Sequence, residues 1–262
     1  MSDAGIIRGV TGSYSPFNAP RAWDLVNSCP GWHQIAMAIS PDHPDFKRQI
    51  QATGFWFVDI PRTSSSALRH ELGRKFGALH GKINVPDKTY ATPQIVPDHR
   101  SVQEMSALLG QDVWNSLFSF TIVRNPWERS LSFYFYRRSH ASVLIPDDWR
   151  FADYLEHVAR ARQGDVHPLL AFPPQYMSCS EFLVDDRDNL AVDDIIRYED
   201  RAAGLARVGA RIGLPDLGAC LINAASPAGR HYSDYYDAAT RACVAELFRE
   251  DCERFGYRFE TP

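Results

Sequence analysis

The stretch that decides the fold is Gly54-Phe-Trp-Phe-Val-Asp-Ile-Pro-Arg-Thr-Ser-Ser-Ser-Ala-Leu-Arg-His-Glu-Leu72. Its first part, Phe55 to Ile60, is rich in the aromatic and β-branched residues that strands favour. Pro61 ends this strand because proline offers no N–H group to a sheet. The apolar spacing then becomes helical, with Leu68 and Leu72 on one face. The stretch therefore predicts a strand, a tight turn and a helix.

The turn between strand and helix carries one cation and four hydroxyl groups, on Arg62, Thr63, Ser64, Ser65 and Ser66. A helix N-terminus exposes unpaired N–H groups and carries roughly half a positive charge, so it readily binds anions. These residues predict a cradle for phosphate or sulfate. They fit equally well a plainer role in which the hydroxyl groups only cap the helix. The glycines and the lysine of the P-loop motif are absent from this turn.

A second stretch, Phe118-Ser-Phe-Thr-Ile-Val-Arg-Asn-Pro-Trp-Glu-Arg-Ser-Leu-Ser132, repeats the pattern of strand, arginine, proline and helix. Arg124 follows the predicted strand at its carboxyl end, where open α/β sheets place their ligands. Ser132 lies about two turns along the helix, where its hydroxyl group can face the same phosphate. The alternative for Arg124 is an ion pair at the strand end, with Glu128 as its partner. Further arginines gather nearby and favour a small polyanionic ligand: Arg129, Arg137 and Arg138.

Together these stretches resemble the sulfotransferases that use 3′-phosphoadenosine 5′-phosphosulfate (PAPS). The turn at Arg62 looks like their 5′-phosphosulfate loop, and the stretch from Arg124 to Ser132 looks like their 3′-phosphate motif. The resemblance is strongest to the carbohydrate-type branch, which includes heparan and chondroitin sulfotransferases and small bacterial members. It covers about Phe55 to Phe259, and the two motifs are specific when they occur together in this order. It continues through His99–Leu109, Ile195–Glu199, Asn223–Ser226 and His231–Phe259.

The resemblance implies a role for each candidate residue. Arg62 and the N–H groups from Thr63 to Ser66 would hold the 5′-phosphosulfate, while Arg124 and Ser132 would bind the 3′-phosphate. Arg230 would belong to a loop that closes over the nucleotide, although a solvated linker arginine is an equal alternative. The resemblance also implies a P-loop-kinase-like sulfotransferase fold, a sugar hydroxyl as acceptor and no metal ion.

His99 is the candidate for the base that deprotonates the acceptor. It precedes a predicted helix, for which Ser101 and Glu104 form a capping box. Histidine suits the task because its ordinary pKa lies near neutral pH. A lone histidine that only satisfies a loop carbonyl is the alternative. His80, Asp98 and Glu104 are the reserve candidates for the base.

Arg62 departs from the family pattern, which has lysine at this position. That lysine is thought to stabilise the oxygen that bridges phosphate and sulfate as negative charge develops on it. Arginine keeps the positive charge but is bulkier and a poor proton donor. Two rival functions therefore stay open: a nucleotide-binding homologue without catalysis, and an ATP-dependent small-molecule kinase of related fold.

The composition favours one domain. The chain has 262 residues and is 45% hydrophobic, enough for one sizeable core. We expect an N-terminal arm over residues 1–52, packed on a sulfotransferase domain over 53–262. The net charge is −4, so the chain lacks the surplus of basic residues that is typical of nucleic-acid-binding proteins. Five cysteines without a Cys-x-x-Cys pair argue against a disulfide framework or a zinc site.

The order of elements predicts a three-layer α/β fold with a mostly parallel sheet. Further strands are expected at Phe182 to Val184 and Ile195 to Tyr198, and a helix at Asp147 to Arg162. Asp237 is the expected N-cap of the last helix, and Gly256 its C′ residue. No apolar run is long enough to cross a membrane, and the N-terminus lacks signal-peptide features. We therefore expect a soluble bacterial cytoplasmic protein; its oligomeric state is not predicted.

Overall fold

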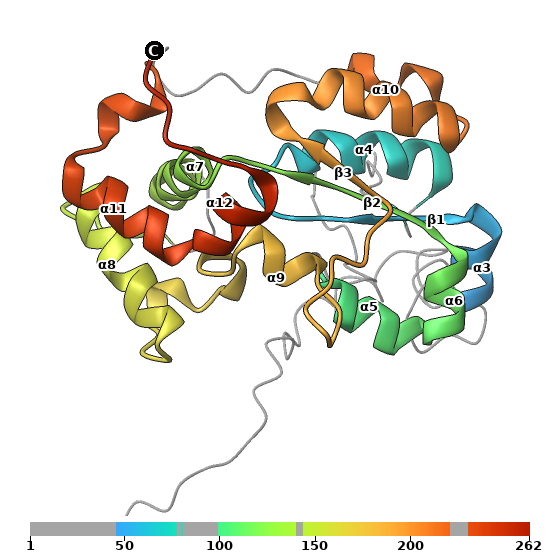
Figure 1. The fold of residues 1–262 in the computed structure, drawn as a ribbon, viewed down its shortest axis with the longest axis horizontal. Coiled ribbons are helices and arrows are strands. Elements are labelled where there is room, and N and C mark those ends of the chain that lie inside the picture. Colours follow the sequence, from blue (N-terminus) through green and yellow to red (C-terminus); the bar gives the residue numbers. More distant parts are fainter. Residues whose placement is uncertain (1–45, 78–79, 81–98, 140–143, 221–229) are drawn as a thin grey trace, which may run out of the picture.

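The computed structural model describes residues 46–77, 80, 99–139, 144–220 and 230–262. At its centre lies a parallel sheet of β1 (Phe55–Val58), β2 (Phe118–Val123) and β3 (Asp194–Arg197), in that spatial order (Figure 1). Phe57 pairs with Phe120, and Thr121 pairs with Ile195. The predicted strands at the two decisive stretches and the parallel α/β architecture are confirmed.

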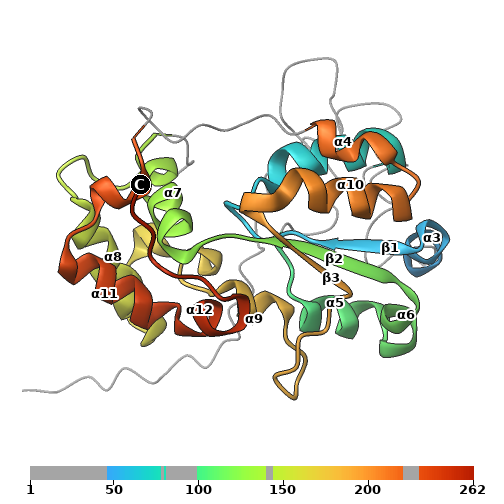
Figure 2. The same cartoon turned by 45° about the horizontal axis from the view of Figure 1, so that its top comes forward.

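The side chains of β1 alternate between two cores, as the two-residue period of a strand requires. Phe55 and Phe57 point to a core covered by α4 (Ser65–Phe76) and α10 (Arg201–Arg211). Trp56 and Val58 point to the opposite core. Figure 2 shows helices above and below the sheet. The described part of the chain thus has helices on both faces of a parallel sheet.

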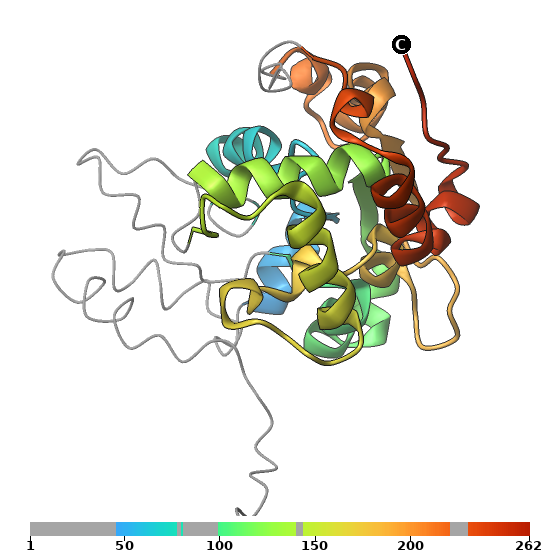
Figure 3. The same cartoon turned by 90° about the vertical axis from the view of Figure 1, so that its left-hand side faces the viewer.

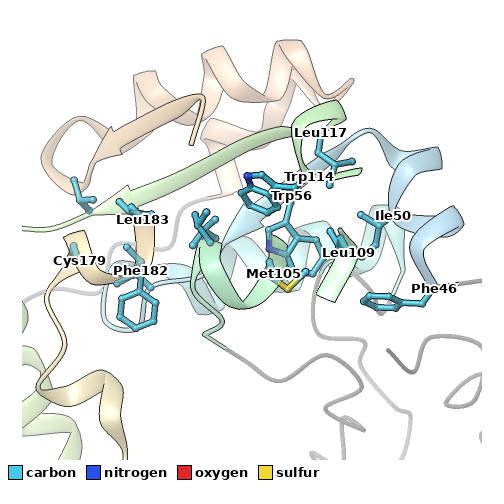
Figure 4. Close-up of a cluster of buried hydrophobic side chains, with 14 of the residues drawn as sticks. Phe46, Ile50, Trp56, Met105, Leu109, Trp114, Leu117, Cys179, Phe182 and Leu183 are labelled. Atoms are coloured by element: carbon cyan, nitrogen blue, oxygen red, sulfur yellow. The ribbon is translucent and has the colours of Figure 1, made fainter. Parts of the chain in front are cut away.

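The second core is closed by four helices: α3 (Phe46–Thr53), α5 (Val102–Leu109), α6 (Gln111–Ser116) and α9 (Cys179–Leu183). Figure 4 shows its side chains, among them Trp56, Met105 and Trp114. The expected N-terminal arm lies mostly outside the described residues. Its end forms α3, where Phe46 and Ile50 are fully buried in this core. This end of the arm therefore packs as part of the domain.

A third core lies beyond the carboxyl ends of the strands. It joins α7 (Pro126–Ser139), α8 (Phe151–Arg162) and α11 (Ala238–Leu247), and α12 (Arg249–Phe255) follows directly. Figure 3 shows these helices from outside. Within the described ranges, no helix is both long and apolar enough to span a membrane. Short 3-10 helices complete the described elements: Pro168–Leu170, Pro173–Gln175, Tyr198–Asp200, Pro215–Cys220 and Tyr232–Tyr235.

The strand predicted at Phe182 to Val184 is wrong, because Cys179–Leu183 form helix α9. Val184 makes only an isolated antiparallel bridge. Ser178 caps this helix in a capping box with Glu181. Asp251, seventy-two positions from Cys179 in sequence, accepts hydrogen bonds from the N–H groups of Cys179 and Ser180 at 2.7 and 2.8 Å. A local capping box and a distant carboxylate therefore both stabilise the start of this helix.

The predicted helices are present with altered bounds. The helix expected from Asp147 begins at Phe151, and the last helix is divided at Phe248 into α11 and α12. Asp237 caps α11 through the N–H of Thr240 at 2.8 Å, as expected. Gly256 ends α12 in the left-handed conformation. These caps agree with the sequence, although the break between α11 and α12 was not predicted.

Candidate functional site

The two arginine-bearing turns lie against each other at the carboxyl ends of β1 and β2. The parallel pairing of Val58 with Thr121 brings the two strand ends to the same edge of the sheet. The Arg124 guanidinium donates a hydrogen bond to the backbone carbonyl of Arg62, at 3.0 Å. The Arg62 and Arg124 turns thus lie side by side, as the binding of one nucleotide by both turns requires.

The side chain of Arg62 reaches across to α7. Its Nε and Nη2 both donate to the Ser132 hydroxyl, at 3.0 and 2.9 Å, and its guanidinium lies 4.7 Å from the centre of the Tyr136 ring. Burial lowers the pKa of Arg62, and the neighbouring positive charge of Arg124 lowers it further. No carboxylate of the described residues pairs with Arg62. An anion bound here would relieve the repulsion between the two cations.

Arg124 already has a carboxylate partner. Its Nη2 lies 2.8 Å from Glu128 Oε1, and its guanidinium stacks 4.1 Å from the centre of the Tyr198 ring. The ion pair anticipated as the alternative role of Arg124 is therefore present. Its Nε is nevertheless buried with no hydrogen-bond partner among the described atoms. Arg124 thus keeps one unused donor, the kind of group that a ligand or a water satisfies in folded proteins.

The turn that leads into α4 has an unusual backbone. Arg62 and Ser64 have φ values of 70° and 73°, in the left-handed region that few non-glycine residues adopt. Ser64 is the N-cap residue of α4, yet its side chain makes no capping hydrogen bond. Thr63 is buried and donates its hydroxyl to the Ile60 carbonyl at 2.7 Å. Neither hydroxyl therefore caps the helix, in contrast with the plainer role considered from the sequence.

The last two hydroxyl groups of the turn differ in exposure. Ser65, the first residue of α4, is buried and helps to lower the pKa of the nearby Asp59, whereas Ser66 is exposed. Strained backbone and uncapped N–H groups at the start of a twelve-residue helix resemble the geometry of anion-binding turns. The structure thus supports the interpretation that backbone groups, more than hydroxyl groups, would form the cradle.

His99 lies beside the same turn. Its Nδ1 is 3.0 Å from the Asp59 carbonyl oxygen and 3.3 Å from Asp59 Oδ2, and its ring packs edge-on against Phe172. Asp59 directly follows β1 and precedes Arg62 by three positions. The structure therefore brings His99 next to the Arg62 turn. The alternative role, a histidine on a loop carbonyl, describes part of the same contact.

The reserve candidates for the base have other surroundings. His80 contacts Thr53 at 2.8 Å and the Phe55 ring, at the amino end of β1 and so at the opposite end from Arg62. Burial lowers the pKa of His80 to about 4. Glu104 completes the predicted capping box of α5 with Ser101. Asp98 lies outside the described residues.

Arg230 is exposed and directly follows residues 221–229, which are not described, so its role stays a prediction.

Arg129 has a structural role that the sequence did not reveal. It is 2% exposed and donates to three backbone carbonyls: Pro61 at 3.2 Å, Met177 at 2.8 Å and Pro174 at 3.0 Å. It therefore ties the turn before Arg62 to α7 and to the segment around residue 175. Two other arginines of this cluster also have partners within the protein. Arg137 donates to the Leu169 carbonyl, and Arg138 contacts Tyr134 and Asp147.

Two cavities open at the other end of the sheet. One of about 710 Å³ lies beside Trp114, Ser119 and Asp193, and one of about 410 Å³ lies beside Phe118 and Arg211. Both are near the amino ends of the strands, so they are separate from Arg62 and Arg124. Among the described residues, no group of three or more His, Cys, Asp and Glu side chains is arranged to hold a metal ion.

No protein-family model, curated protein or solved structure matches this chain. The residues at the carboxyl ends of β1 and β2, and the contacts between them, therefore provide the basis for assigning a function.

Proposed function

We propose that this protein is a PAPS-dependent sulfotransferase that transfers a sulfuryl group to an acceptor hydroxyl, with a sugar as the expected acceptor. The observation that carries the proposal is the contact between the Arg62 and Arg124 turns, 3.0 Å from guanidinium to carbonyl. Two cations and the N-terminus of α4 lie together there at the carboxyl ends of the strands, where parallel α/β sheets place their ligands. A P-loop-kinase-like arrangement of the fold is part of the same proposal.

In this proposal, the two ends of the nucleotide bind to adjacent turns. Arg62 and the N–H groups from Thr63 to Ser66 hold the 5′-phosphosulfate. Arg124 and Ser132 hold the 3′-phosphate. Ser132 can serve both turns, because a hydroxyl group accepts hydrogen bonds from Arg62 while donating its own proton to a phosphate oxygen.

The reaction would be an in-line transfer, in which catalysis comes mainly from positioning and charge stabilisation, as in phosphoryl transfer. Arg62 would stabilise the negative charge that grows on the leaving phosphate oxygen. Burial and the charge of Arg124 lower the pKa of Arg62. An arginine starts from a value so high that the side chain stays charged at neutral pH. Arg62 can therefore supply the positive charge that a lysine supplies at this position in the resembling family, but it donates a proton far less readily than that lysine.

Thermal stability with nucleotides tests the proposal against a kinase. We expect 3′-phosphoadenosine 5′-phosphate (PAP) to raise the melting temperature, and ADP with Mg²⁺ to have no comparable effect. Stabilisation by ADP with Mg²⁺ alone would favour the kinase. No stabilisation by either nucleotide would contradict nucleotide binding at this site.

Release or transfer of labelled sulfate from PAPS tests the proposal against a binding protein without catalysis. We expect slow turnover in the wild-type protein that is lost in Arg62→Ala. Arg150→Ala is the matched control, because the Arg150 side chain is 80% exposed and pairs only with the nearby Asp153 among the described residues. Equal turnover in both variants would refute the role of Arg62. PAP binding without any turnover would favour the non-catalytic alternative.

A further inference from the structure

We infer that Asp59 is a positioning residue for His99, holding its ring so that Nε2 faces the reaction as the unprotonated nitrogen. This inference rests on the proposed function, in which His99 is the base. Two oxygen atoms of the same residue approach one ring nitrogen: the Asp59 carbonyl oxygen at 3.0 Å and Asp59 Oδ2 at 3.3 Å, both from His99 Nδ1.

The chemistry of these two partners fixes the tautomer. A backbone carbonyl only accepts hydrogen bonds, and an ionised carboxylate also only accepts. Burial alone would raise the pKa of Asp59, but protonated His99, Arg69 and Ser65 outweigh it and hold the value at about 2, and Arg69 stays charged beside Asp59 when the His99 ring is neutral. Asp59 is therefore ionised at neutral pH. Nδ1 must carry the proton in the neutral ring, which leaves Nε2 as its basic nitrogen.

The backbone of His99 shows that this placement is held by its surroundings. His99 has φ 66°, a left-handed conformation that costs free energy in a non-glycine residue and persists where neighbouring contacts impose it. The Asp59 carboxylate is itself anchored by Arg69, whose Nη1 lies 3.1 Å from Asp59 Oδ2. Among the described residues, Asp59 and Arg69 thus place charged groups near Nδ1, and the Phe172 ring packs edge-on against the imidazole.

The arrangement would act in one balanced step. As the acceptor oxygen bonds to sulfur and the bond from sulfur to the phosphate oxygen breaks, the acceptor proton passes to His99 Nε2. PAP leaves with the electron pair of the broken bond. The imidazolium that forms lies beside the negative Asp59 carboxylate, which stabilises it. Asp59 itself touches neither nucleotide nor acceptor in this step, so its role is to orient and to stabilise.

The direct test is an NMR titration of His99, with its signal identified by its loss in His99→Gln. In Asp59→Asn we expect the pKa of His99 to fall, because a neighbouring negative charge is removed. In Arg69→Gln we expect it to rise, because a cation is removed and Asp59 stays charged. Nitrogen shifts of the wild-type ring should report a protonated Nδ1. A protonated Nε2 in the neutral ring, or no pKa change in either variant that folds, would overturn the inference.

Turnover then separates this inference from the proposed function. In Asp59→Asn we expect kcat to fall roughly tenfold to a hundredfold, with the KM for PAPS little changed. The acidic limb of the rate profile should move to lower pH with the pKa of His99. If the pKa of His99 shifts in the variants but the wild type has no sulfotransferase activity, the contact between Asp59 and His99 is confirmed and the proposed function is wrong. Wild-type activity with an unmoved pH profile in Asp59→Asn would refute the positioning role alone.

Discussion

Replacing Arg129 by lysine tests how the site is supported. The Arg129 guanidinium is buried and satisfies three carbonyl oxygens, on Pro61, Met177 and Pro174. A lysine keeps the charge but has no planar fork, so at least one or two of these carbonyls would lose their donor. Each unsatisfied buried polar group costs about 1–3 kcal/mol. We therefore expect Arg129→Lys to lower the free energy of unfolding by about 3 kcal/mol.

Urea denaturation followed by circular dichroism measures this loss. Arg160→Lys is the matched control, because Arg160 makes an ion pair with Asp165 in which the two side chains are 50% and 63% exposed. Such exposed pairs contribute at most about 1 kcal/mol, so the control should remain close to the wild type. The reasoning is refuted if Arg129→Lys and Arg160→Lys are equally stable. We also expect weaker PAP binding in Arg129→Lys, because the carbonyl that it holds precedes Arg62.

Two further predictions concern stability away from the nucleotide. The pKa of His80 is lowered from 6.5 to about 4, so the unfolded chain binds a proton that the folded chain excludes, and stability falls as the pH drops from about 6.5 to 4. The free energy of unfolding should fall by about 3 kcal/mol over this pH range in the wild type, and by much less in His80→Gln. An equal pH dependence in urea titrations of both proteins would contradict this prediction. Gly204→Ala would place a Cβ 2.4 Å from Ile196 Cγ2, between α10 and β3. We expect a loss of about 1–3 kcal/mol in denaturant unfolding, and an unchanged midpoint would show that α10 moves freely.

The sequence predicted best those features that depend on neighbouring residues. The aromatic and β-branched run of β2, the capping box at Ser101 and the cap at Asp237 are local patterns, and the structure confirms them. The strand prediction for helix α9 overlooked the local capping box of Ser178 and Glu181, and the Asp251 carboxylate that also stabilises the start of this helix lies far away in sequence. A local window contains no signal for such a partner.

The same contrast between local patterns and distant partners applies to the candidate site. The resemblance implies that one nucleotide contacts both arginine-bearing turns, and the parallel pairing of β1 and β2 does bring Arg62 and Arg124 together. The contact of Asp59 with His99 joins residues forty positions apart. It depends on a loop conformation with φ 66° that no residue pattern indicates. Arg129 looked like a ligand-binding arginine, because its sequence neighbours do not reveal the carbonyls that it contacts.

Calorimetric titration with PAP and with adenosine 5′-phosphate, which lacks the 3′-phosphate, tests most directly whether one nucleotide reaches both turns. A charge-assisted contact contributes about 1.5–3 kcal/mol, so the wild-type protein should prefer PAP by roughly tenfold to a hundredfold. In Arg124→Gln we expect this preference to be largely lost, while the affinity for adenosine 5′-phosphate stays near the wild-type value. An equal preference for PAP in both proteins would contradict the account.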